Sequence, residues 1–286
     1  MFGETNLTIN KEQKTALLTG ASRGIGHATV KRFNADGWRV LTCSRQAFDE
    51  RCPFPGGKEN HIQVDLSDPK QTIAAAEEIK SKLNGKLHAL INNAGISPKL
   101  ADAGRMNTLN TDLHVWGQVF HVNFFAPVIL ARALKHELAA TKAAIVNVTS
   151  IASSRVHPFA GAAYATSKAA LAALTREMAH DYGPMGVRVN AIVPGEIETN
   201  ILSEGTDEIV QNLALRRLGQ PRQPAAAPAP APAQHQHQQQ SADGDMHWSR
   251  RPPSPASARP SGGVETVRSN TAANLRASRP KSPSST

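Results

Sequence analysis

The chain has 286 residues and a formal net charge of +9. Its length indicates one large domain or two small ones and allows a substantial buried core. The charge excess alone would suggest nucleic-acid binding, but residues 1–220 carry 24 basic and 20 acidic side chains, whereas residues 221–286 carry 8 and 3. More than half of the excess lies in the last quarter of the chain, so we expect no nucleic-acid binding by the main domain.

The cysteines and the N-terminal segment indicate a compartment. Cys43 and Cys52 have no metal-type spacing and form no disulfide framework, which is typical of a reduced cytoplasm. Residues 1–14 are polar and lack the apolar stretch of a signal peptide, and we find no apolar run of bilayer length. We therefore expect a cytoplasmic protein with no membrane segment and no metal site.

Residues 13–200 alternate short apolar runs with helical patterns. Strands are predicted at residues 15–19, 38–43, 61–64, 87–91, 143–148 and 187–193. One helix is predicted to start with residues 26–33, and further helices are predicted at residues 72–83, 122–138 and 164–182. Apolar strands separated by helices indicate a parallel sheet covered on both faces. The predicted fold class is α/β, a doubly wound parallel sheet in a single Rossmann-type domain.

The composition divides the chain into an N-terminal extension at residues 1–12, a domain at residues 13–221 and a tail at residues 222–286. Residues 221–286 hold 11 of the 19 prolines and no Ile, Phe or Tyr. Such a segment cannot bury enough apolar surface to offset the entropy of ordering. We predict a disordered tail rich in Pro, Ala, Gln, Ser and Arg.

A glycine-rich loop follows the first predicted strand. Gly20, Gly24 and Gly26 have the spacing Gly-x-x-x-Gly-x-Gly and open the first helix. Glycines allow the backbone to turn tightly and to approach a pyrophosphate at a helix N-terminus. Such a loop alone is weak evidence, but its strand–turn–helix context favours a dinucleotide site.

The end of the second strand indicates which dinucleotide is bound. An acidic residue there would select NAD through a ribose 2′-hydroxyl, but the sequence has Ser44 and Arg45. Arg45 could bind a 2′-phosphate as a fork, with Ser44 as a hydroxyl partner and Arg23 adding charge, or it is only a solvated loop residue. We expect NADP(H) in preference to NAD(H). Asp65, after the third strand, could accept from an adenine amine or cap the next turn.

Polar residues end the fourth strand and open the last long helix. Asn92 and Asn93 lie where the sheet would meet a cofactor, and their side chains can tie neighbouring loops together. Tyr164 and Lys168 are four residues apart, which places the phenol and the ammonium on one helical face. A neighbouring cation lowers the pKa of a phenol and suits it to general acid–base work. By spacing alone, such a pair is more often a Tyr that packs on a helix and a Lys that takes no part in catalysis.

Taken in order and spacing, these motifs resemble the short-chain dehydrogenase/reductase family over residues 14–199, with a weaker continuation to residue 221. The glycine loop, the Ser44-Arg45 ending and residues 216–221 look most like its NADPH-dependent 3-oxoacyl-carrier-protein-reductase-like branch. The matching motifs are Thr19-Gly20, Gly24-Ile25-Gly26, Asp65-Leu66, Asn92-Asn93-Ala94-Gly95, Asn123, Ser150, Tyr164, Lys168 and Pro194-Gly195-Glu196-Ile197-Glu198-Thr199.

The resemblance implies roles for four catalytic residues. Tyr164 is expected to be the general acid in carbonyl reduction and the base in alcohol oxidation. Lys168 would lower the pKa of Tyr164 and bind the nicotinamide ribose, and Ser150 would hydrogen-bond the substrate oxygen. Asn123 would hold a water for a proton relay to Lys168.

The resemblance also implies a cofactor site that spans the whole domain. Pro194 and Gly195 would wall the nicotinamide ring, with Ile197 and Thr199 contacting the carboxamide. The expected cofactor-binding residues are Gly20, Ser22, Arg23, Gly24, Ile25, Gly26, Ser44, Arg45, Asp65, Leu66, Asn93, Ala94, Gly95, Tyr164, Lys168, Pro194, Gly195, Ile197 and Thr199.

The sequence departs from the family after Pro221. Family members continue into a helix, a last parallel strand and an Asp-Gly-Gly close, and this chain shows none of them. The abrupt change of composition suggests a shifted reading frame. We expect the sheet to lack that last strand and the preceding helix. The loss would remove one of the two usual subunit interfaces, so we expect a homodimer in place of a tetramer.

Three functions are compatible with these observations. The first is an NADP-dependent oxidoreductase that transfers hydride between nicotinamide and a small-molecule carbonyl or secondary alcohol, of the 3-oxoacyl type or a small ketone. The second is a catalytically impaired family member that binds dinucleotide without efficient turnover. The third is an interaction protein whose basic tail binds acidic or proline-recognising partners.

Overall fold

The computed structural model describes residues 13–50, 56–199, 210–211 and 216–221. Within them, one parallel six-stranded sheet has the order β3-β2-β1-β4-β5-β6. The strands are β1 Thr15–Thr19, β2 Arg39–Ser44, β3 His61–Gln63, β4 Ala89–Asn92, β5 Ala144–Val148 and β6 Arg188–Ile192. The chain leaves β1 toward β2 on one side, and β4 returns on the other side. A crevice for a ligand is expected beyond the carboxyl ends of strands at such a switch point. The predicted doubly wound parallel sheet is confirmed.

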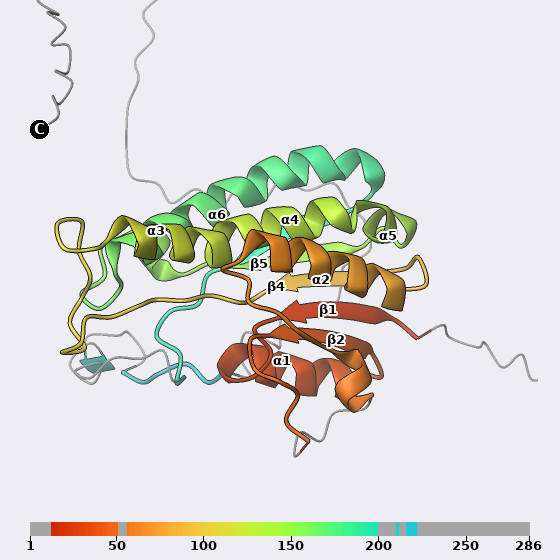
Figure 1. Cartoon of the computed structure of the whole chain (residues 1–286), viewed down its shortest axis with the longest axis horizontal. Helices are drawn as coiled ribbons and strands as arrows, with labels where there is room; N and C mark the ends of the chain where they lie inside the picture. The colour runs from red at the N-terminus through yellow and green to blue at the C-terminus, as the bar shows by residue number, and fades with distance from the viewer. Residues whose placement is uncertain (1–12, 51–55, 200–209, 212–215, 222–286) are drawn as a thin grey trace, which may run out of the picture. The chain divides into compact units, whose positions relative to one another are not determined.

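The helices lie on both faces of this sheet (Figure 1). They are α1 Gly24–Ala35, α2 Pro69–Lys82, α3 Leu113–Phe120, α4 Ala126–Ala133, α5 Lys135–Ala140 and α6 Ala162–Tyr182. Short helical turns are η1 Gly57–Asn60, η3 Ile151–Ser153 and η4 Gly183–Met185, and η2 His121–Phe125 is a π-helical turn between α3 and α4. Figure 1 shows α2, α4 and α6 on one face of the sheet and α1 on the other.

The core follows from the alternation of side chains along the central strands. Leu17 of β1 belongs to the larger apolar cluster, which also includes Ile79 of α2, Leu130 of α4 and Met178 of α6. Leu18, the next residue, belongs to the smaller cluster with Val30 of α1. Both leucines are 0 % exposed. The central strands are therefore buried on both faces, which fixes their carboxyl ends and the loops that follow them.

The predicted helix at residues 122–138 is wrong in its detail. The structure begins this helical segment at Leu113, inserts the π-helical turn η2 around Asn123 and ends α4 at Ala133 before α5. The side chain of Asn123 makes tertiary hydrogen bonds to Ile96 and Ser167, and a π-helical turn is a common way to aim a side chain at a functional site.

The expectation that no apolar run reaches bilayer length is also wrong. The helical segment Leu113–Ala133 has 21 residues and a mean hydropathy of 1.3, which is sufficient by length and composition to cross a membrane. Val119, Ala126 and Leu130 of this segment are buried in the protein, and Asn123 is 0 % exposed. In the most apolar part of this segment, 33 % of the residues are buried in the protein.

Several predictions fall outside the described residues: the N-terminal extension, the tail at residues 222–286 and the absence of a last strand and helix. They stay predictions. Within the described part of the chain, β6 forms one edge of the sheet, and its residues Arg188, Asn190 and Ala191 are exposed. Residues 216–221 lie beside the segment that follows β6, because Ile197 and Gly219 form a parallel bridge.

Candidate active site

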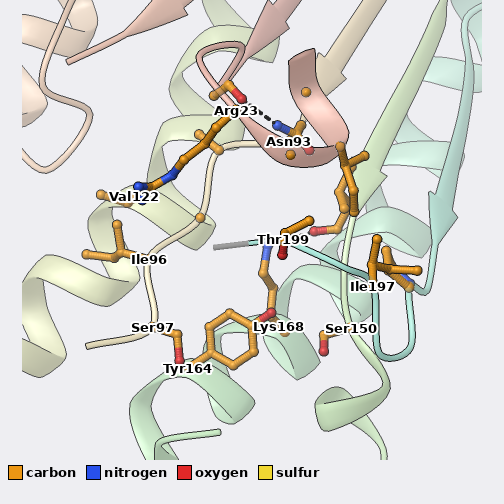
Figure 2. A pocket seen from close by; sticks show the side chains of 18 of the residues that line it. Arg23, Asn93, Ile96, Ser97, Val122, Ser150, Tyr164, Lys168, Ile197 and Thr199 are labelled. Atoms are coloured by element: carbon orange, nitrogen blue, oxygen red, sulfur yellow. Dashed lines mark hydrogen bonds between the residues drawn. The ribbon is translucent and has the colours of Figure 1, made fainter. Parts of the chain in front are cut away.

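A cavity of about 330 Å³ collects the predicted site residues at the carboxyl ends of the strands. All predicted cofactor-binding residues line it, and so does Ser150. Of the predicted catalytic residues, Asn123 alone does not line the cavity, although its neighbour Val122 does. Figure 2 shows the side chains of Tyr164, Lys168 and Ser150 close together at one end, with Arg23 and Asn93 toward the other end.

The glycine loop has no room for a side chain at Gly20 or at Gly26. Gly20 has a φ of +69°, and a Cβ there would lie 2.8 Å from the Cα of Ala94. A Cβ at Gly26 would overlap the carbonyl oxygen of Gly20 and lie 2.9 Å from its carbonyl carbon. Contacts with backbone atoms at these distances cannot be relieved by a small side-chain movement. The loop can therefore approach a ligand closely, as a pyrophosphate site demands.

The N-terminus of α1 differs from that of α2. Asp68 caps α2 by accepting from the backbone amides of Lys70 at 2.8 Å and Gln71 at 3.3 Å. The N-cap of α1 is Arg23, whose side chain makes no capping hydrogen bond. The first residues of α1 line the cavity, so their amides and the positive end of the helix dipole suit an anion there. The residues present thus fit the pyrophosphate of a dinucleotide.

Asn93 holds the glycine loop to the end of β4. Its side-chain amide donates to the carbonyl oxygens of Thr19 at 3.0 Å and Gly20 at 2.9 Å. The backbone amides of Asn93 and Ala94 in turn donate to the Thr19 hydroxyl. Neighbouring Asn92 is 2 % exposed and donates to Asn147 at 2.8 Å. The expectation that an asparagine here ties neighbouring loops together is confirmed for Asn93, whereas Asn92 joins the strands β4 and β5.

The end of β2 presents a cation to the cavity. Arg45 is exposed and lines the cavity, and its guanidinium has no ion-pair partner within residues 13–50, 56–199, 210–211 and 216–221. Ser44 donates to the carbonyl oxygen of Gln46 at 3.0 Å. Asp65 accepts from the backbone amide of Ser67 at 2.9 Å and from its hydroxyl at 2.8 Å. Asp65 therefore does cap the following turn, while it also lines the cavity.

Tyr164 and Lys168 lie on α6 one turn apart. Lys168 is 3 % exposed, and its ammonium donates to the carbonyl oxygen of Val148 at 2.7 Å. Burial lowers the pKa of Lys168 to about 8. The Nζ atom lies 5.9 Å from the centroid of the Tyr164 ring, and Ser150 is the N-cap of η3, at the end of β5.

The expected lowering of the Tyr164 pKa is not found in this structure. Burial raises the pKa of Tyr164, hydrogen bonding to Ser150 lowers it, and the charge of Glu196 raises it further; the net direction is upward. The ammonium of Lys168 is engaged with Val148 and is itself buried. Burial is the largest cause of the upward shift of the Tyr164 pKa and outweighs the hydrogen bond to Ser150, which spacing along a helix could not reveal.

Asn123 supports the site from behind the cavity. Its amide donates to the carbonyl oxygen of Ile96 at 3.1 Å and to Ser167 at 3.0 Å, and its carbonyl oxygen accepts from the amide of Ile96 at 2.9 Å. A Cβ built on Gly95 would lie 3.5 Å from that carbonyl oxygen and 3.3 Å from the Lys168 Nζ atom. Asn123 and Lys168 therefore approach the same point beside Gly95.

Besides Cys43 of β2, the sequence prediction missed three titratable residues that line the cavity: Lys99, His157 and Glu196. Nε2 of His157 lies 2.6 Å from Oε1 of Glu196. The ammonium of Lys99 donates to the carbonyl oxygen of Phe159. Glu196 belongs to the motif after β6 that did point to the cofactor, but the other two lie in loops without a recognisable pattern.

The described residues hold no group of three or more His, Cys, Asp or Glu side chains arranged for a metal ion.

A glycine loop at the start of α1, together with a Tyr, a Lys and a Ser around one cavity, defines a nicotinamide-dependent oxidoreductase. The family model for short chain dehydrogenase matches residues 14–209. The chain belongs to this family, whose members use NAD(P) to oxidise alcohols or to reduce carbonyl groups on small molecules.

Individual proteins are similar to this chain along most of the domain. Protein FixR of Bradyrhizobium diazoefficiens is 57 % identical over 217 residues, 75 % of this chain and 78 % of that protein. The crystal structure of a short-chain oxidoreductase from Brucella ovis, in complex with a partially ordered NAD, is 67 % identical with a TM-score of 0.62; the match covers 64 % of this chain and 83 % of that one. A 3-oxoacyl-[acyl-carrier protein] reductase from Brucella melitensis with bound NAD is 28 % identical with a TM-score of 0.65, covering 75 % and 82 %.

Proposed function

We propose that the protein is an NADP-dependent carbonyl reductase or alcohol dehydrogenase in which Tyr164 is the general acid and base. One observation carries this proposal: Tyr164, Lys168 and Ser150 line the same cavity as the glycine loop. The substrate class is a small ketone or a 3-oxoacyl compound. The presence of Tyr164, Lys168 and Ser150 in one cavity favours turnover over dinucleotide binding alone.

The side chains divide the work of carbonyl reduction. When bound, the nicotinamide supplies the hydride, which carries both electrons to the carbonyl carbon and leaves the cofactor oxidised. Ser150 donates a hydrogen bond to the carbonyl oxygen, where negative charge develops. Tyr164 gives that oxygen its proton, and the product is an alcohol. Lys168 stabilises the phenolate that remains, and in alcohol oxidation the phenolate takes the proton back.

The preference for NADP(H) is proposed from charge. Arg45 and Arg23 line the cavity and are exposed, and Ser44 lies beside Arg45 at the end of β2. A guanidinium fork binds a phosphate with two parallel hydrogen bonds. The 2′-phosphate of NADP(H) would gain these contacts, and NAD(H), which has no such phosphate, would not.

The decisive experiment measures the oxidation of NADPH and of NADH by the purified full chain with a panel of ketones and β-keto esters. Tyr164→Phe should lower kcat about 100-fold or more, while binding of NADPH, followed by fluorescence, should stay within about two-fold. No turnover of any carbonyl compound by the parent chain, with NADPH still bound, would support the impaired alternative. Unchanged turnover in Tyr164→Phe would remove the phenol from the mechanism.

We further propose a homodimer in the cytoplasm. Leu113 of α3 is 83 % exposed and Phe125, in η2, is 43 % exposed, so this side of the molecule offers apolar surface to a second copy. Light scattering of the purified chain tests the oligomeric state, and a monodisperse tetramer would contradict the dimer. Cell fractionation followed by immunoblotting tests the compartment.

A further inference from the structure

A buried pair of titratable side chains lies at the Tyr164 end of the cavity and has no part in the proposed hydride transfer. Nε2 of His157 and Oε1 of Glu196 are 2.6 Å apart, and the two side chains are 11 % and 8 % exposed. His157 comes from the loop between η3 and α6, and Glu196 from the loop after β6. Both residues line the cavity.

The hydrogen bonds around His157 fix the position of its proton. The backbone amide of Phe159 donates to Nδ1 of His157 at 3.2 Å, so Nδ1 must carry a lone pair. The proton of the neutral imidazole then lies on Nε2 and is donated to Glu196. Nε2 of His157 lies 2.6 Å from Oε1 of Glu196, so His157 holds this carboxyl group in place.

Glu196 retains the capacity to accept another hydrogen bond. A carboxylate has about four lone-pair sites on its two oxygens, and His157 is the sole side-chain partner of Glu196 in the described part of the chain. The carboxylate is close enough to the phenol to contribute to the raised pKa of Tyr164. Because Tyr164 and Glu196 line the same cavity, a substrate whose carbonyl faces Tyr164 can offer a second polar group to Glu196.

The neighbouring cation Lys99 decides which kind of hydrogen-bond donor on the substrate suits Glu196. Phe159, whose amide orients His157, accepts with its carbonyl oxygen from the ammonium of Lys99. Lys99 also lines the cavity, and Arg105 donates to the carbonyl oxygen of Ala160 at 2.8 Å. The ammonium of Lys99 would repel an ammonium group on a substrate in the same cavity. A neutral hydroxyl group donates to Glu196 without that repulsion.

We propose that Glu196, oriented by His157, binds a second hydroxyl group of the substrate, so that the protein reduces α-hydroxy ketones and oxidises vicinal diols in preference to simple ketones and alcohols. This inference rests on the proposed carbonyl reductase activity and names its substrate class. Glu196 contacts the substrate, whereas His157 is a positioning residue that acts through Glu196.

A matched pair of substrates tests the inference. The parent chain should reduce 3-hydroxy-2-butanone with a kcat/KM about 10-fold or more above that for 2-butanone, because a hydrogen bond to a charged group is worth about that much. Glu196→Ala should remove most of this preference, so that the ratio of the kcat/KM for 3-hydroxy-2-butanone to that for 2-butanone falls about 10-fold. Glu198→Gln, at an exposed position of the same loop, is the control and should keep the preference.

A pH profile separates recognition from a merely structural role. Among the described residues, Lys168 has its Nζ atom 5.9 Å from the Tyr164 ring centroid, Glu196 acts on the phenol by its charge, and His157 is hydrogen-bonded to Glu196. Glu196→Gln removes a charge that raises the pKa of Tyr164, so the alkaline rise of 2,3-butanediol oxidation should move to lower pH. Glu198→Gln should not move it. Glu196→Gln keeps an acceptor for His157 and serves if Glu196→Ala fails to fold.

The outcomes of these experiments distinguish a failure of this inference from a failure of the proposed carbonyl reductase activity. If the parent reduces no carbonyl compound with either cofactor, the proposed function itself fails. If the parent reduces both ketones with equal efficiency, the activity stands and the role of Glu196 is refuted. If Glu196→Ala loses activity on both ketones in parallel, with an unmoved pH profile in Glu196→Gln, the pair only holds the two loops together and the inference is likewise wrong.

Discussion

The two ends of the cavity differ in whether backbone atoms or side chains form them. At the glycine-loop end, the contacts are made by backbone: Gly20 and Gly26 leave room for it, and Asn93 donates to main-chain carbonyl oxygens. At the Tyr164 end, side chains from three separate segments meet, and four of them are titratable: Tyr164, Lys168, His157 and Glu196. The first end can accept a ligand whose shape does not vary, and the second can be adapted to a substrate by exchanging side chains.

The largest effect is expected from placing a side chain at the glycine-loop end. Gly26→Ala would push a Cβ into the carbonyl group of Gly20, so dinucleotide affinity should fall about 100-fold or more, or the chain should not fold. Gly117→Ala is the matched control, because a Cβ at Gly117 of α3 meets nothing within 4 Å, and a helical Ala is favoured over Gly by about 1 kcal/mol. Fluorescence titration with NADPH and thermal unfolding measure both variants. Tight NADPH binding by Gly26→Ala would show that the loop does not approach the pyrophosphate.

At the Tyr164 end of the cavity, the buried ammonium of Lys168 should make the free energy of unfolding depend on pH. Burial lowers the pKa of Lys168 to about 8, below its value of about 10.4 in an unfolded chain. Between these values the unfolded chain binds more protons, so the free energy of unfolding should rise with pH across this window, by on the order of 3 kcal/mol in total.

Lys168→Met removes this titration. Urea unfolding at pH 7 and pH 10 should show that the variant gains stability relative to the parent at pH 7 and loses that advantage by pH 10. Lys31→Met, at an exposed position of α1, should follow the parent at both values. A parent whose stability falls between pH 8 and pH 10 relative to Lys168→Met would contradict the burial of a titrating ammonium.

An intermediate effect is expected at Arg45, an exposed cation that follows β2 and lines the glycine-loop end of the cavity. Arg45→Ala should raise the KM for NADPH about 10- to 100-fold, since a hydrogen bond to a charged group contributes about 1.5–3 kcal/mol, and should leave the KM for NADH nearly unchanged. Arg176→Ala, at an exposed position of α6, is the control. Equal changes for both cofactors, or a parent that prefers NADH, would place Arg45 outside the recognition of a 2′-phosphate.

The two ends also differ in how far the sequence predicts them. The strands were predicted to within about two residues because apolar runs fully buried in a parallel sheet are visible in one dimension. The glycine loop was predicted because its backbone demands a residue type. The π-helical turn at Asn123 was not, since it depends on hydrogen bonds to Ile96 and Ser167. Nor was the contact between His157 and Glu196, which joins loops 39 residues apart.

The smallest effect is expected at Cys43, which lies at the end of β2 and lines the glycine-loop end of the cavity. Cys43 is 1 % exposed, and burial raises the pKa of its thiol to about 12. At pH 8 the reactive thiolate is then about one part in ten thousand. In a Cys52→Ser background, iodoacetamide at pH 8 should leave the native protein unlabelled over hours, and mass spectrometry should find complete labelling in urea. Rapid labelling of the native protein would mean that β2 opens readily, and the glycine-loop end would then not be the rigid half of the site.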